Sequence, residues 1–185
     1  MTRYRISGVV FRADHPEHMD LAETAKASRN EPGRFNTSRF GAVYLSLEPD
    51  TAIRERQRNE GKGQHPCALF VVSLSVESVV DLSTDERLEQ WGLTRADLTS
   101  DDLSCTQQMA EAAVATGVQA IVWPSATGQG SSLAVFYDRL TDGSDLDVIQ
   151  SFELSTTVMN AADAGVPIAT IHPLLSTYTR ATISP

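Results

Sequence analysis

Four side chains that could carry out chemistry lie on short elements of this sequence: Arg34, Tyr44, Glu55 and Ser125. Arg34 follows a Pro-Gly turn, Tyr44 lies in a short β-rich run, and Glu55 lies in the helical segment that comes next. The planar fork of an arginine suits bidentate contacts with phosphate or carboxylate groups. A carboxylate can stabilise a developing positive charge. We therefore expect these consecutive elements to bring a guanidinium, a phenol and a carboxylate together.

Each of these residues also has a structural interpretation. Arg34 could be a surface turn residue, and Glu55 could pair with Arg58 about one helical turn further on. Tyr44 at the end of a strand is more often part of a core, and Ser125 after a proline is more often a turn hydroxyl. The residue types alone leave these alternatives open.

Hydrophobic periodicity predicts the elements that would position the four side chains. Expected strands cover residues 4–11, 40–45, 68–76, 79–82, 119–123 and 133–137, with a possible edge strand at 149–154. Expected helices cover a segment within residues 14–28, residues 49–59, 84–90 and 101–116. In the first helix we expect Met19, Leu21 and Ala22 to face inward, and the second should stop at the glycines of residues 61–63.

Strands and helices alternate without strict βαβ regularity, so the predicted class is α+β, with a mixed or antiparallel sheet as the core and flanking helices. A chain of 185 residues is long enough to bury such a core in one domain. The last thirty residues give no clear pattern.

The formal net charge of −9 argues against a nucleic-acid-binding protein, whose affinity depends on a basic surface. An anionic substrate would need a local group of arginines to overcome this field, whereas a basic protein partner would be favoured by it. No apolar run approaches the length of a signal peptide or a membrane span, so we expect a cytoplasmic protein.

Several familiar catalytic and ligand-binding motifs are absent. The sequence contains no P-loop, G-x-G-x-x-G, G-x-S-x-G or H-E-x-x-H pattern. His15 and His18 are three residues apart but have no evident third ligand, so no metal is expected. Cys67 and Cys105 match no metal spacing, and we interpret both as buried thiols.

Short motifs in a particular order resemble the RES domain family. They are Gly33-Arg34-Phe35-Asn36, Tyr44-Leu45-Ser46, Thr51-Ala52 with Glu55, and Pro124-Ser125-Ala126. The resemblance extends over about residues 4–137. It implies a toxin of a bacterial toxin–antitoxin pair, a fold similar to ADP-ribosyltransferase toxins, NAD as the substrate and an Xre-like helix-turn-helix antitoxin as the partner.

The resemblance also implies roles for individual residues. Glu55 would stabilise the oxocarbenium-like transition state as the bond between nicotinamide and ribose breaks. Arg34, Tyr44 and Ser125 would bind NAD. Secondary candidates are Arg5 and Arg39 for the pyrophosphate, and Asn36, which could touch the ligand or fix the Arg34 turn. No prosthetic group is implied.

Three functions remain open at this point. The first is NAD degradation by hydrolysis or phosphorolysis, the second is ADP-ribose transfer to a host protein, and the third is a non-catalytic domain that binds its antitoxin or itself. We expect residues 1–141 to form the RES-like catalytic domain and residues 142–185 to pack on it as a C-terminal extension.

Overall fold

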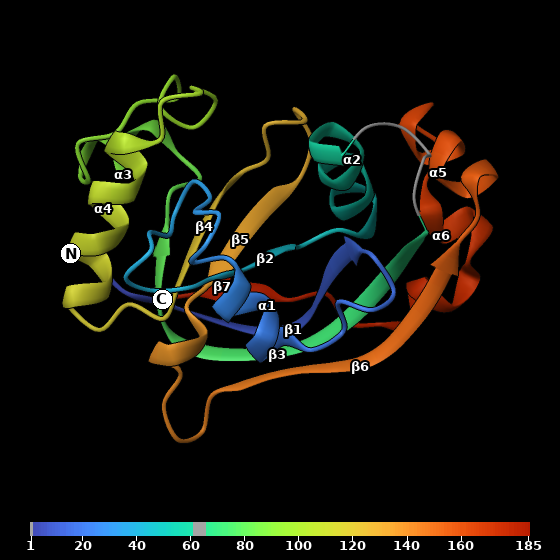
Figure 1. Cartoon of the computed structure of the whole chain (residues 1–185), viewed down its shortest axis with the longest axis horizontal. Helices are drawn as coiled ribbons and strands as arrows, with labels where there is room; N and C mark the ends of the chain where they lie inside the picture. Colours follow the sequence, from blue (N-terminus) through green and yellow to red (C-terminus); the bar gives the residue numbers. More distant parts are fainter. Residues whose placement is uncertain (1, 61–65) are drawn as a thin grey trace.

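The computed structural model describes residues 2–60 and 66–185, and within them the strands form one mixed sheet (Figure 1). Its order is β6-β3-β4-β5-β2-β1-β7, and β3 also pairs with β1. The strands are β1 (Tyr4–Asp14), β2 (Val43–Ser46), β3 (Cys67–Asp81), β4 (Ala120–Pro124), β5 (Ser131–Val135), β6 (Asp145–Leu154) and β7 (Thr182–Ser184). The α+β class and the mixed sheet are confirmed.

Strand β3 pairs with three other strands, β1, β4 and β6. Most of its length lies antiparallel between β1 and β6, and its last residues run parallel to β4. The sequence predicts two strands here, with a break at Glu77 and Ser78, but the structure has one. The break is unnecessary because both backbone N–H groups donate to the side-chain oxygen of Gln119, at 2.9 and 3.2 Å.

The pairings around β2 close the sheet on itself. Strand β2 is antiparallel to β5 over four residue pairs, and it meets β1 where Phe11 lies opposite Ser46. Strands β4 and β5 are antiparallel neighbours. The short strand β2 therefore places Tyr44 and Ser46 beside the end of β1, close to the start of the following helix.

Helices flank this sheet (Figure 1). They are α1 (Leu21–Ala27), α2 (Pro49–Glu60), α3 (Asp85–Glu89), α4 (Ser104–Ala115), α5 (Thr156–Asp163) and α6 (Ile168–Ile171), with 3-10 turns at Tyr137–Arg139 and Pro173–Thr177. Helices α3 and α4 lie at one end of the molecule, and α5 and α6 lie at the other. None of the helices in the described ranges is long and apolar enough to cross a membrane.

Two details of the helices differ from the prediction, the position of Met19 and the start of α4. In α1 the side chain of Asp20 accepts the N–H of Glu23 and caps the helix, so Met19 lies outside it and is 52% exposed rather than inward. Asp102 accepts the N–H of Ser104 at 2.9 Å, and α4 starts there instead of at residue 101. The predicted end of α2 at residues 61–63 lies outside the described residues.

The two cysteines differ in environment. Cys67 is buried at the start of β3, as predicted, but Cys105 is exposed. The prediction was wrong for Cys105 because the buried face of α4 is formed by other positions, including Thr106, Met109 and Ala110.

The C-terminal residues take part in the same sheet. Strand β6 pairs with β3 and β7 pairs with β1. Helix α2 contacts this part of the chain through Gln57, which donates to the backbone oxygen of Met159 at 3.0 Å, and Asp50, which accepts the N–H of Ile168 at 2.7 Å. These bonds attach α2 to helices α5 and α6.

Candidate active site

Helix α2 places Glu55 on the wall of a cavity. Pro49 starts the helix, where its missing N–H would have no partner. Ala52, Glu55, Arg56 and Asn59 follow one another at helical spacing, and all four line the cavity, whose volume is about 380 Å³. The helical period therefore accounts for the presence of Glu55 and Arg56 on the same wall.

The Glu55 carboxylate has a defined orientation. The Ser125 hydroxyl donates to Oε1 of Glu55 at 2.6 Å, and the Ser132 hydroxyl lies 3.4 Å from the same oxygen. The other oxygen, Oε2, is 3.8 Å from the guanidinium of Arg58. The predicted Glu55–Arg58 pair thus exists, but the carboxylate also makes the serine contacts expected of a positioned group.

Ser125 is held by the turn that joins β4 to β5. Its N–H donates to the oxygen of Gly130 at 3.0 Å, and its own backbone oxygen accepts from Gly128 at 3.1 Å. Its hydroxyl also accepts the N–H of Thr127 at 3.1 Å. Ser125 is 6% exposed and lies behind Glu55, so its effect on the cavity passes through that carboxylate.

A network around the Tyr44 hydroxyl shapes the Arg34 turn. This hydroxyl donates to Oδ1 of Asn36 and accepts the N–H of Phe35, both at 2.9 Å. The Asn36 side chain also accepts the N–H of Gly33 at 2.8 Å and donates to the oxygen of Ser28 at 2.8 Å. Asn36 is fully buried, and these bonds correspond to the expected role of fixing the Arg34 turn.

Gly33 allows the turn to approach the ring of Tyr44. A Cβ atom at this position would lie 2.6 Å from the Tyr44 hydroxyl oxygen. Burial raises the pKa of Tyr44 strongly, although the Phe35 N–H and the charge of Arg34 oppose this shift. The phenol is therefore neutral at ordinary pH and acts as a hydrogen-bonding group.

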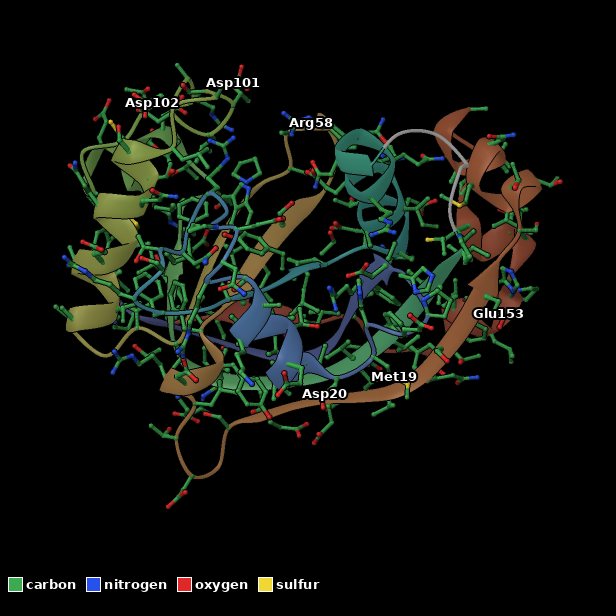
Figure 2. All side chains as sticks on the ribbon, in the orientation of Figure 1. Met19, Asp20, Arg58, Asp101, Asp102 and Glu153 are labelled. Atoms are coloured by element: carbon green, nitrogen blue, oxygen red, sulfur yellow. The ribbon has the colours of Figure 1, made fainter. Side chains whose placement is uncertain are left out.

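The Arg34 guanidinium is held by the loop before α4. Its two terminal nitrogens donate to the backbone oxygens of Asp97 at 2.8 Å and Ser100 at 3.0 Å. Burial and the nearby charge of Arg58 lower the pKa of Arg34, with Glu55 among the groups that act in the opposite direction. The charge of Asp101 also acts to raise the pKa of Arg34. Figure 2 shows Asp101 and Arg58 toward the same edge of the molecule.

The charges that line the cavity contrast with those of the whole chain. Its lining includes four arginines, Arg12, Arg34, Arg56 and Arg58, and two carboxylates, Asp14 and Glu55. Apolar surface comes from residues such as Phe11, Leu45 and Trp123. A cavity of this kind can bind an anionic ligand that also contains aromatic or sugar rings. Its arginines provide local positive charge although the net charge of the protein is −9.

The structure brings Arg34, Tyr44 and Glu55 to one cavity, with Ser125 behind Glu55. It does not bring Arg5 or Arg39 there. Arg5 is exposed and pairs with Glu77 at 2.8 Å, and Arg39 is exposed and lies 3.5 Å from Glu111. Arg5 lies near the start of β1, whereas the cavity is lined by the last four residues of that strand.

Four charged residues of the cavity were not among the predicted site residues: Arg12, Asp14, Arg56 and Arg58. The available signal was an arginine and an aspartate two residues apart in an apolar strand, where charges are rarely buried without partners. No group of three or more His, Cys, Asp or Glu side chains suited to a metal occurs among residues 2–60 and 66–185.

Comparison with known proteins identifies the family of this chain. The family model of the RES domain matches residues 9–157, so the chain belongs to the RES domain family. It is similar to the NAD(+) phosphorylase MbcT of Mycobacterium tuberculosis (strain ATCC 25618 / H37Rv), with 27% identity over 163 residues, 83% of this chain and 82% of that protein. MbcT of Mycobacterium bovis (strain ATCC BAA-935 / AF2122/97) shows the same similarity.

A solved structure has a similar fold. A chain in the crystal structure of the M. tuberculosis MbcT–MbcA toxin–antitoxin complex matches with a TM-score of 0.76 and 26% identity. The match covers 88% of this chain and 93% of that chain. The similarity therefore extends over most of this chain.

Proposed function

We propose that this chain is the toxin of a bacterial toxin–antitoxin pair and that it depletes NAD by cleaving the bond between nicotinamide and ribose. Membership of the RES domain family and similarity to MbcT, which is named an NAD(+) phosphorylase, support this function. The name of that relative also favours phosphate over water as the acceptor. An ADP-ribosyltransferase-like fold is part of the same proposal.

The observation that carries the proposal is Glu55, a carboxylate oriented by Ser125 at the wall of an arginine-lined cavity. Cleavage of a glycosidic bond builds positive charge on the ribose, and a nearby carboxylate stabilises that charge. Arg34 would bind a phosphate group of NAD. The Tyr44 ring and Trp123, which contact each other edge to face with centroids 6.2 Å apart, offer apolar surface for a ring of the substrate.

The proposed partner is an Xre-like helix-turn-helix antitoxin. The comparison structure is a toxin–antitoxin complex, which supports an antitoxin partner for this chain. The net charge of −9 favours association with a partner that carries basic surface. Copurification of the chain with the antitoxin, and loss of NAD cleavage in the complex, would test this part of the proposal.

The enzymatic test uses the purified protein with NAD, in the presence and absence of inorganic phosphate. We expect NAD loss with release of nicotinamide, and a rate that rises with phosphate. Glu55→Gln should lower the rate about 100-fold or more, the effect typical of removing one electrostatic contact to a transition state. Glu77→Gln is the matched control, because Glu77 is an exposed carboxylate outside the cavity.

Intact NAD with a folded wild-type protein would contradict the proposal. Equal rates in the wild type and Glu55→Gln would contradict the assigned role of Glu55. Appearance of labelled protein in place of free ADP-ribose or its phosphate would redirect the function to protein modification.

A further inference from the structure

The cavity that Glu55 lines also contains a buried charge cluster that the proposed function does not use. Asp14, at the end of β1, forms ion pairs with Arg12 and, at 2.7 Å, with Arg56 of α2. The exposed fraction of these three side chains is only 10–12%. All three line the cavity that contains Glu55.

The Asp14 carboxylate holds the cluster together. Besides the two arginines, it accepts the N–H of His15 at 2.7 Å and lies 3.0 Å from Nδ1 of His18. Arg12 is fixed further, because one of its nitrogens donates to the oxygen of His18 at 2.9 Å and to the hydroxyl of Thr24 at 3.1 Å. The two guanidiniums are therefore held in place before any ligand binds.

Stability alone gives little reason to bury two guanidiniums beside one carboxylate. Buried ion pairs are often no better for stability than packed apolar side chains, because each charge loses its hydration. A group of fixed arginines at a cavity wall is instead well suited to bind a phosphate group, since each guanidinium presents donors in a planar fork. Binding at such a site needs little reorganisation.

We propose that Arg12 and Arg56, positioned by Asp14, form a subsite for a phosphate group in the cavity of Glu55. This inference rests on the proposed function, and it extends that function by assigning phosphate binding to arginines other than Arg34. The phosphate group has two possible sources, inorganic phosphate as the acceptor or the pyrophosphate of NAD. Arg56 follows Glu55 directly on α2, so a phosphate bound there shares the cavity with the reacting carboxylate.

If the source is inorganic phosphate, the reaction balances without a further reactant. The bond between C1 of the nicotinamide ribose and the ring nitrogen breaks, and its electron pair leaves with nicotinamide, which becomes neutral. An oxygen of hydrogen phosphate forms the new bond to C1. The products are nicotinamide and the 1-phosphate of ADP-ribose, and the proton stays on the phosphate during the bond change.

Calorimetric titration with inorganic phosphate at constant ionic strength, together with steady-state kinetics in both substrates, tests the subsite. Arg56→Gln should weaken phosphate binding or raise one KM by about tenfold or more, since it removes charged hydrogen bonds. Arg39→Gln is the matched control, because Arg39 is an exposed arginine outside the cavity. Arg56→Lys keeps the charge and the pair with Asp14 but loses the fork, so its effect should be intermediate.

The outcomes separate the two sources. A raised KM for phosphate with an unchanged KM for NAD identifies inorganic phosphate, and a raised KM for NAD alone identifies the pyrophosphate. Unchanged phosphate binding and unchanged KM values in folded Arg56→Gln and Arg56→Lys would overturn the subsite. The titration needs no turnover, so a wild-type protein that binds phosphate through Arg56 but leaves NAD intact would contradict the proposed function and not the subsite.

Discussion

The hydroxyl of Ser125 donates a 2.6 Å hydrogen bond to Oε1 of Glu55, although the two residues are 70 positions apart. One residue comes from the turn after β4 and the other from the middle of α2. The bond orients a carboxylate that lines the cavity, whereas the serine itself is buried behind it. The same hydroxyl bonds to Thr127 within its own turn, so the contact with Glu55 links the β4–β5 turn to α2.

Ser125→Ala should lower kcat for NAD cleavage about 10- to 100-fold, the range that corresponds to one hydrogen bond to a charged group. The KM for NAD should change little, because Ser125 reaches the cavity only through Glu55. Separate measurement of kcat and KM checks this result. Ser38→Ala is the control, since Ser38 is exposed on another loop. An unchanged kcat would show that Ser132 and Arg58 suffice to orient Glu55.

Tyr44→Phe should destabilise the protein by about 1–3 kcal/mol, because the Phe35 N–H and the Asn36 oxygen each lose a buried partner. The Tyr44 pKa is raised by burial above its ordinary value of 10.0. Its contribution is therefore complete below pH 10 and decreases as the pH rises further, since only the unfolded phenol then loses its proton. Urea unfolding of both proteins between pH 8 and 11 should show the difference shrinking above pH 10. A pH-independent difference would contradict this account.

Much of the site could be predicted from the sequence because its residues lie on elements with clear local signals. The Pro-Gly turn, the strand at Tyr44 and the proline-initiated helix place Arg34, Tyr44 and Glu55 close together along the chain. The family resemblance implies that Ser125 joins them. The pairing of β2 with β5 that brings Ser125 close is not shown by local patterns.

The arginines of the cavity were harder to predict. Arg5 and Arg12 lie on the same strand, and the choice between them depends on how β1 packs against α2. Arg12 meets Asp14 and Arg56 only in the folded chain. The C-terminal strands were also difficult, because β7 has only three residues and is specified by its pairing with β1 rather than by its own composition.

Expression of the chain alone should arrest bacterial growth, and either Arg34→Ala or Glu55→Ala should relieve the arrest. The physical reason is loss of anion binding in the first variant and loss of charge stabilisation in the second. Growth and intracellular NAD should be followed at equal protein levels. Arg39→Ala and Glu77→Ala, which change exposed residues outside the cavity, should remain toxic. Equal toxicity of all four variants would argue that growth arrest does not come from this site.

Asp14→Asn should destabilise the protein at neutral pH by about 3–5 kcal/mol, because Arg12 and Arg56 lose the charge that pairs with them. Burial acts to raise the pKa of Asp14, but Arg12, the His18 and His15 bonds and Arg56 together lower it below the ordinary value of 3.8. A lowered pKa means that the stabilisation is complete above pH 3.8 and is lost as the pH falls through the lower value in the folded protein. Urea unfolding from pH 6 to pH 2 should therefore bring the two proteins together at the acidic end. A difference that persists at pH 2 would mean that the aspartate acts through its shape and hydrogen bonds rather than through its charge.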